Sequence, residues 1–155
     1  MTRSAPHRFS GILAVLCLLG GCADVGPELG GLAEEVAQHR RMWEARGQSA
    51  YVYELERQCF CGVEARGPVR VTVEGNQVTG RIYSDSGGAV PEPFAHLFPT
   101  VDGLFDILED ALARSAERVE VTWDDESGFP WSFFIDYSVT MADEEVGYSI
   151  LSGPS

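Results

Sequence analysis

The sequence predicts an α+β domain in which an antiparallel sheet of about six strands carries two helices on one face. Apolar residues repeat with helical spacing over residues 32–46 and 101–114, and with a period of two in the segments that follow each of them. The predicted order is therefore helix, three strands, helix, three strands. The short connections between the strands favour hairpins, and hairpins make a sheet antiparallel.

The first helix is expected over residues 32–46. Acidic residues near its start and arginines toward its end match the direction of the helix dipole, and Gly47 supplies a stop. Its predicted apolar face consists of Leu32, Val36, His39 and Trp43.

Three strands should follow. Tyr51, Tyr53 and Leu55 alternate with other residues in the first strand, which starts near Ala50. Residues 69–74 form the second strand. Residues 74–77, with the sequence Glu-Gly-Asn-Gln, predict a tight hairpin into a third strand over 78–83. Residues 84–99 then form a long loop, and loops of this length are often functional or mobile.

Thr100 is the expected N-cap of the second helix, residues 101–114. The apolar stripe of this helix consists of Val101, Leu104, Phe105, Leu108 and Leu112. Strand character returns around residues 119–123, 131–137 and 148–151, which completes the sheet.

The N-terminus predicts an export signal. Arg3 and Arg8 precede an apolar stretch, Phe9–Leu19. At helical rise this stretch spans about 16 Å, roughly half of a bilayer core. It is therefore predicted to be a signal peptide and not a membrane-spanning helix.

The signal ends in Leu19-Gly20-Gly21-Cys22, which resembles the lipobox of bacterial lipoproteins. The resemblance implies cleavage after residue 21 and acylation of Cys22, including palmitate. The mature protein would then be held in the lipid bilayer through Cys22. Ala23 replaces the Asp that retains lipoproteins at the inner membrane, which favours the outer membrane where the organism has one.

The predicted organisation is a signal peptide at 1–21, a lipid-anchored tether at 22–31 and a single globular domain at 32–155. Three glycines and a proline in residues 23–31 are typical of a tether. The chain has 24 acidic residues against 11 basic ones, all of them Arg, and a net charge of −13. Such a surface repels phosphate backbones, so no nucleic-acid partner is expected.

Several landmarks of residues 43–151 together resemble an uncharacterised family of bacterial, mostly lipid-anchored proteins known only as a domain of unknown function. The landmarks are Tyr51-x-Tyr53, Cys59-Phe60-Cys61, Val71-x-Val73-x-Gly75, Thr100-Val-Asp-x-Leu-Phe105, Trp123-Asp124 with Gly128-Phe129-Pro130, Ile135-Asp136, and Asp143-Glu144-Glu145 before Tyr148. The chain departs from the family pattern at Trp123, Asp125 and Phe129, where the family has Tyr, Pro and Tyr. The resemblance implies a fold and a location at the membrane, but it implies no activity.

Cys59 and Cys61 are the free pair once Cys17 leaves with the signal and Cys22 is acylated. On a regular strand their Cα atoms would lie about 6.5–7 Å apart, at or beyond the disulfide limit. A bridge therefore requires the strand to bulge or end, which Gly62 permits. Four states remain open: a structural disulfide, buried thiols, a reducible redox couple, and a soft-metal site with His39 or His96.

The acidic residues and the histidines are further candidates for metal-binding or catalytic groups. The acidic groups Asp124-Asp125-Glu126, Asp136 and Asp143-Glu144-Glu145 are predicted to be solvated turns, with a calcium site as the alternative. His39 is predicted to be packed and not catalytic, and no G-x-S-x-G motif accompanies His96.

The leading hypothesis is a monomeric, non-enzymatic lipoprotein of the cell envelope that needs no cofactor. It would serve as a binding or structural module, with an envelope protein or another envelope component as its partner. Its expected contact surfaces are the 84–99 loop and exposed aromatics at 129–131. The alternative is a thiol-redox or metal-handling protein that uses Cys59 and Cys61. A secreted hydrolase inhibitor is a third hypothesis, based on size and architecture alone.

Overall fold

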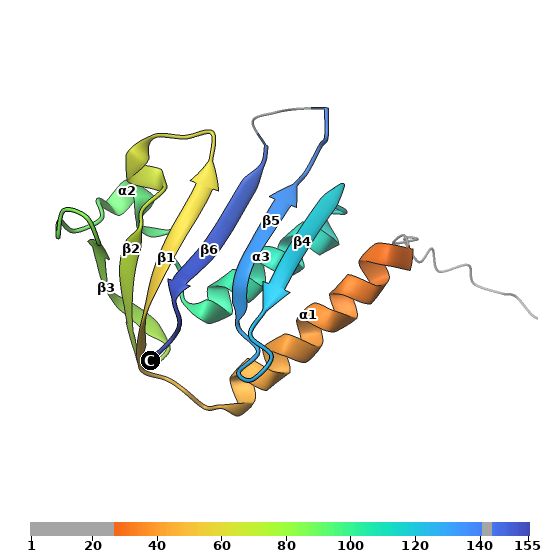
Figure 1. Cartoon of the computed structure of the whole chain (residues 1–155), viewed down its shortest axis with the longest axis horizontal. Coiled ribbons are helices and arrows are strands. Elements are labelled where there is room, and N and C mark those ends of the chain that lie inside the picture. The colour runs from red at the N-terminus through yellow and green to blue at the C-terminus, as the bar shows by residue number, and fades with distance from the viewer. Residues whose placement is uncertain (1–26, 141–143) are drawn as a thin grey trace, which may run out of the picture.

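The computed structural model describes residues 27–140 and 144–155 (Figure 1). The elements of the first half are α1 (Pro27–Ala45), β1 (Tyr51–Cys59), the 3-10 helix η1 (Val63–Ala65), β2 (Val69–Glu74) and β3 (Gln77–Tyr83). The elements of the second half are α2 (Glu92–Ala95), α3 (Val101–Ala113), β4 (Arg118–Trp123), β5 (Pro130–Asp136) and β6 (Val146–Ser152). The predicted α+β class and the order of two helices and six strands are confirmed, with α2 as an added single turn.

All six strands form one antiparallel sheet in the order β3-β2-β1-β6-β5-β4. The two central strands, β1 and β6, come from opposite ends of the domain and join its two halves. Their register pairs Arg57 with Tyr148 and Cys59 with Val146. The end of β1 therefore lies beside the beginning of β6.

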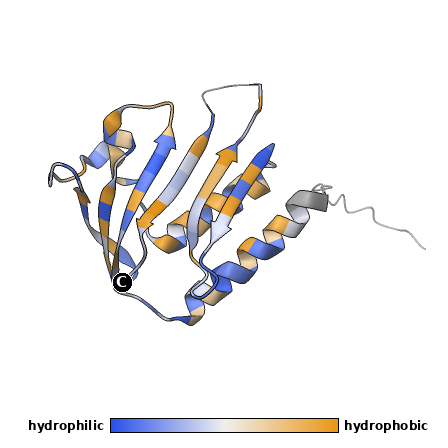
Figure 2. Cartoon of the chain, in the orientation of Figure 1, coloured by the Kyte–Doolittle hydropathy of each residue, from blue (hydrophilic) through white to orange (hydrophobic). Residues whose placement is uncertain are grey.

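One face of the sheet is covered by helices (Figures 1 and 2). Tyr51, Tyr53 and Leu55 point to this inner face and are buried, as their alternation predicts. The whole predicted stripe of α3 is also buried. Trp43 of α1 packs edge-on against Tyr51, and Phe105 of α3 stacks on Trp123, so both helices share the inner face. No element among residues 27–140 and 144–155 covers the outer face.

The first helix begins earlier than the sequence indicates. It starts at Pro27 and takes in Gly30 and Gly31, which the sequence placed in the tether. Proline is well suited to the first turn of a helix, because its missing N–H has no partner there in any case. Residues 1–26, with Cys22, lie outside the described residues. Within the described ranges, no helix is long and apolar enough to cross a bilayer.

The two expected contact surfaces are partly drawn into the domain, and their role in binding stays a prediction. The 84–99 loop turns back on the domain, since Ile82 bridges to Ala89 and Phe98 is fully buried. Phe129 is also buried, at 4% exposure, and only Trp131 of that segment is exposed. Phe98 and Phe129 are buried because large aromatic side chains gain more from the core than from solvent.

Candidate functional site

Residues 59–66 form a turn at the end of β1 that carries both cysteines, and we call it the cysteine turn. It begins at the last residue of β1, Cys59, bends at Phe60 and Cys61, and closes with η1. Phe60 is 88% exposed and Val63 is 64% exposed, and Phe60 is the most exposed large apolar residue of the described chain. The turn therefore presents two large apolar side chains to solvent.

The cysteine turn is tied to the domain at several points. The backbone N–H of Arg57 donates to the carbonyl of Arg66 at 2.7 Å and closes the base of the turn. Ala65 is buried at 6% exposure. The Tyr83 hydroxyl donates to the carbonyl of Glu64 at 2.7 Å. These contacts fix both the start and the end of the turn.

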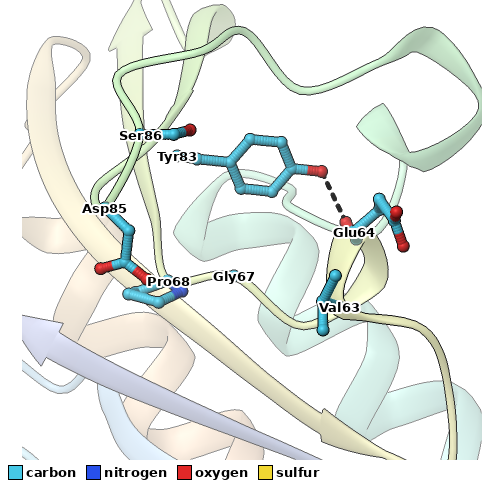
Figure 3. Close-up of a pocket in the computed structure, with 7 residues that line it drawn as sticks. All are labelled: Val63, Glu64, Gly67, Pro68, Tyr83, Asp85 and Ser86. Carbon is cyan, nitrogen blue, oxygen red and sulfur yellow. Dashed lines mark hydrogen bonds between the residues drawn. The ribbon is translucent and has the colours of Figure 1, made fainter.

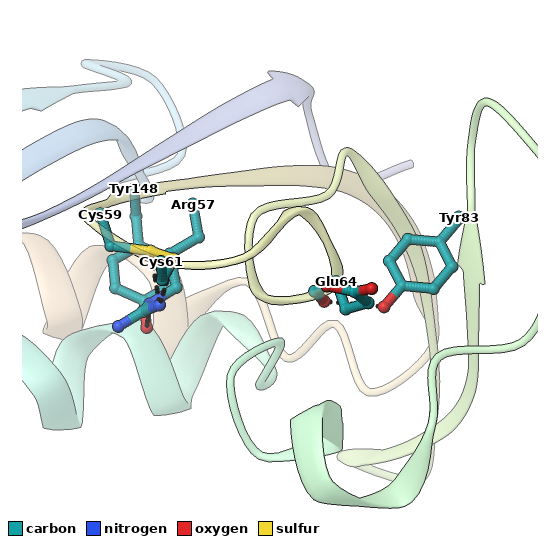
Figure 4. Close-up of a disulfide and its surroundings, with 6 residues drawn as sticks. All are labelled: Arg57, Cys59, Cys61, Glu64, Tyr83 and Tyr148. Atoms are coloured by element: carbon teal, nitrogen blue, oxygen red, sulfur yellow. Dashed lines mark hydrogen bonds between the residues drawn. A yellow bond between two sulfur atoms is a disulfide. The ribbon is translucent and has the colours of Figure 1, made fainter.

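A disulfide joins Cys59 and Cys61 (Figure 4). Their Cα atoms lie 5.3 Å apart, within the usual range for a bridge. The approach is possible because β1 ends at Cys59, so that the chain bends where a regular strand would hold the two residues apart. Both cysteines are half-buried. Their oxidation state in the cell stays a prediction.

Arg57 lies against both sulfur atoms (Figure 4). Its Nη1 donates to Cys59 Sγ at 2.9 Å and lies 3.6 Å from Cys61 Sγ. Its Nε donates to the hydroxyl of Tyr148 at 3.2 Å, and its guanidinium lies 5.8 Å from the centre of that ring. Burial raises the pKa of Tyr148, while the charge and hydrogen bond of Arg57 oppose this shift. Tyr148 is therefore a neutral acceptor at neutral pH.

Four open hollows surround the turn and the neighbouring sheet face. One, of about 220 Å³, lies between the turn and the end of β3 (Figure 3). It is lined by Val63, Glu64, Gly67, Pro68, Tyr83, Asp85 and Ser86. Two hollows of about 270 and 300 Å³ share Cys59 and Phe60. The last, of about 350 Å³, lies on the uncovered sheet face and meets the 300 Å³ hollow at Gln58 and Phe134.

The acidic residues do not gather at one site. Asp124 caps its own turn, because its carboxylate accepts from the backbone and hydroxyl of Ser127. These bonds lower the pKa of Asp124. Asp136 is buried and accepts from the Ser138 backbone at 2.9 Å. Asp143 lies outside the described residues, and within 27–140 and 144–155 no three His, Cys, Asp or Glu side chains are grouped as metal ligands.

The two histidines in the described part of the chain, His39 and His96, lie in different environments. His39 stacks on Trp123 with ring centres 4.3 Å apart and an interplanar angle of 5°. Its Nδ1 is buried and has no hydrogen-bond partner among the described residues. His96 is exposed and caps α2. Neither ring is grouped with Cys59 and Cys61 as a metal ligand, and the soft-metal hypothesis finds no further ligand in the described chain.

The landmark Trp123-Asp124 with Gly128-Phe129-Pro130 has a structural explanation. The backbone of Gly128 donates to Asp124 and that of Asp124 donates to Phe129, which closes a tight turn between β4 and β5. Phe129 packs edge-on against Trp43 of α1, and the Trp123 Nε1 donates to Glu35 at 2.7 Å. This turn therefore docks the second half of the chain onto the first helix.

The sequence identified the cysteines and overlooked Arg57. A signal was present, because Arg57 precedes Cys59 by two residues and so lies on the same face of β1. Tyr148 could not be found in this way, since its position beside Arg57 depends on the pairing of β1 with β6.

Comparison with known proteins identifies the domain without assigning an activity. The model of a family of unknown function, DUF6174, matches residues 35–152. No curated protein and no solved structure matches the chain.

Proposed function

We propose that this chain, which belongs to the DUF6174 family of unknown function, is a lipoprotein of the cell envelope whose domain binds an envelope protein through the cysteine turn. The family match extends over most of the domain and supplies no activity, so the proposal depends on the residues themselves. The observation that carries it is the exposure of Phe60 on a turn tied down at both ends.

The physical argument is one of preorganisation. Binding a flexible loop requires its side chains to be ordered, whereas the cysteine turn is already held by the disulfide, the base hydrogen bond and buried Ala65. Aromatic side chains are enriched in interface cores, and anchors of this kind carry much of the binding energy. The hollows beside Phe60 could receive side chains of the partner.

The partner surface is tested by site-specific photocrosslinking in the native envelope. A photoreactive phenylalanine at position 60 should give an adduct with a defined protein. The matched control is position 151, because Leu151 is 51% exposed at the far end of β6 from the turn. Excess purified chain should abolish the adduct, and excess chain with Phe60→Asp should not. No adduct, or equal adducts from both positions, contradicts the proposal.

The lipid anchor is supported by the lipobox ending at Cys22. The test is incorporation of a labelled palmitate analogue into the full-length chain expressed in a bacterium. Cys22→Ser should abolish both the label and the membrane association. Cys17→Ser is the matched control, because it removes a thiol from the signal segment and should leave both unchanged. Label retained in Cys22→Ser would overturn the anchor.

A further inference from the structure

We propose that Cys59 and Cys61 form a redox couple that passes its disulfide to a dithiol of an exported protein, with Arg57 as the residue that positions and stabilises the leaving sulfur of Cys59. This activity goes beyond the binding role and does not depend on it, because it is a property of the pair and its own neighbours.

The first support is the direct contact between a cation and both sulfurs. Arg57 Nη1 lies 2.9 Å from Cys59 Sγ and 3.6 Å from Cys61 Sγ. A guanidinium in this position interacts weakly with a neutral disulfide and strongly with a thiolate, since a charge-assisted hydrogen bond is about twice as strong as a neutral one. The contact therefore stabilises the reduced form more than the oxidised form, and this makes a disulfide a better oxidant.

The second support is that Arg57 is held for this contact. Tyr148, opposite it on β6, accepts from Nε and places its ring beside the guanidinium. Arg40, Arg114 and Arg118 each form an ion pair with a carboxylate. Arg57 forms none with any described carboxylate. The charge of Arg57 is therefore available to the sulfur atoms in a strongly acidic chain.

The third support is access. Cys59 and Cys61 are half-buried and both line the 270 Å³ hollow, together with Phe60 and Arg66. Cys59 also lines the 300 Å³ hollow, where Glu145 is the charged lining residue. A disulfide enclosed in a core could not be attacked, whereas the 270 Å³ hollow lets a peptide thiol approach Cys61. Exposed Phe60 lies between the two cysteines and offers an apolar contact to the incoming chain.

The exchange balances without further reactants. A thiolate of the exported dithiol attacks Cys61 Sγ, the bond between the two sulfurs breaks, and Cys59 leaves as a thiolate beside Arg57. The second thiolate of the substrate then attacks its own sulfur in the mixed disulfide, and Cys61 leaves. Two electrons pass from the substrate to the pair, and the protons of the two substrate thiols go to solvent or to the cysteines. The products are the reduced pair and a substrate disulfide.

The test measures the equilibrium of the pair with glutathione. The full-length chain with Cys17→Ser and Cys22→Ser, in detergent, is equilibrated in defined mixtures of reduced and oxidised glutathione and trapped for mass analysis. In that background, Arg57→Gln should lower the ratio of dithiol to disulfide about tenfold, the effect of losing one charge-assisted hydrogen bond. Arg57→Lys should restore part of the ratio. The matched control Arg70→Gln removes an exposed arginine of β2 and should change nothing.

A second measurement needs no Arg57 variant and covers the case in which that variant fails to fold. The reduced chain is alkylated with iodoacetamide over a range of pH, and mass fragmentation assigns each adduct. Cys59 should react at lower pH than Cys61, because Arg57 is closer to it. Equal ratios for the parent chain and Arg57→Gln, or identical alkylation profiles for the two cysteines, would overturn the redox proposal. The crosslinking at position 60 would be unaffected by either result.

Discussion

At the scale of single residues, two buried tyrosine hydroxyls of the inner face are paired with backbone groups. Tyr51 and Tyr53 point from β1 toward the start of α3. The Tyr53 hydroxyl donates to the carbonyl of Pro99, and the Tyr51 hydroxyl accepts from the backbone N–H of Val101 at 3.0 Å. Two tyrosines thus satisfy backbone groups that the chain must bury where the loop enters the helix.

These tyrosines predict a loss of stability at alkaline pH. Burial raises the pKa of Tyr51 from 10 to about 12, and burial also raises that of Tyr53. Between pH 10 and about 12 the unfolded chain releases the tyrosine protons that the folded chain keeps. The free energy of unfolding should therefore fall as the pH rises through this range. Urea unfolding at pH 8, 10 and 11 measures the decline.

Tyr51→Phe is the matching variant. At pH 7 it should lower the free energy of unfolding by about 1 kcal/mol, because the N–H of Val101 loses its acceptor. Its decline with pH should be shallower than that of the parent chain. Identical pH slopes for the two chains would show that Tyr51 ionises no later in the folded state than in the unfolded one.

At the scale of elements, local chemistry sets several boundaries close to where the sequence indicates. Gly47, with φ of 62°, follows the end of α1. Gly75 and Asn76 have φ of 58° and 62°, which is the pattern of a tight two-residue hairpin between β2 and β3. Thr100 caps α3, since its side chain accepts from the backbone N–H of Gly103 at 3.1 Å. These glycine, turn and cap signals involve residues close together in the chain, so they can be recognised in the sequence.

The cap of α3 gives a prediction with a built-in control. Thr100→Ala should lower the free energy of unfolding by about 1 kcal/mol, because one N–H of the first turn loses its acceptor. Thr100→Ser keeps the oxygen and should stay close to the parent chain. Chemical denaturation followed by far-ultraviolet circular dichroism compares the three. A loss that is equal for Ala and Ser would assign the effect to packing of the threonine methyl group.

At the scale of the whole molecule, the two halves are joined in three places. The pairing of β1 with β6 makes one sheet of them. The turn between β4 and β5 docks on α1 at Gly128, where a Cβ would lie 2.5 Å from the carbonyl oxygen of His39 and 2.8 Å from Met42 Cβ. Arg40 adds ion pairs from α1 to Asp106 and Glu109 of α3. The first helix is thus integrated into the domain.

Gly128→Ala should therefore be far more damaging than an ordinary glycine substitution. Gly128 has φ of 87° and no room for a Cβ, whereas Gly75 has φ of 58° and open space around it. Gly75→Ala should cost about 1 kcal/mol, the conformational penalty alone. Gly128→Ala should cost several kcal/mol in total, because the turn must move off α1. Thermal unfolding of the two variants gives the comparison, and equal losses would rule out the close approach.

The extent of sequence-based prediction follows from the range of the interactions involved. The class, the element order, the buried alternation of β1 and the stripe of α3 could all be predicted, because each depends on neighbours within a few positions. The early start of α1 and the burial of Phe129 could not, since both depend on contacts with distant parts of the chain. The export signal and the anchor at Cys22 belong to residues that the structure does not describe, and they stay predictions of the sequence.

The sequence by itself determined the fold class and singled out the pair Cys59 and Cys61, because periodicity and residue type are local properties. Only the tertiary structure decided what surrounds the pair. The end of β1 lets the two cysteines approach, and the pairing with β6 places Tyr148 where it holds Arg57 against the sulfur atoms. Tyr148 lies 91 residues from Arg57 along the chain. A contact across such a separation is specified by the register of the sheet, which no local pattern encodes.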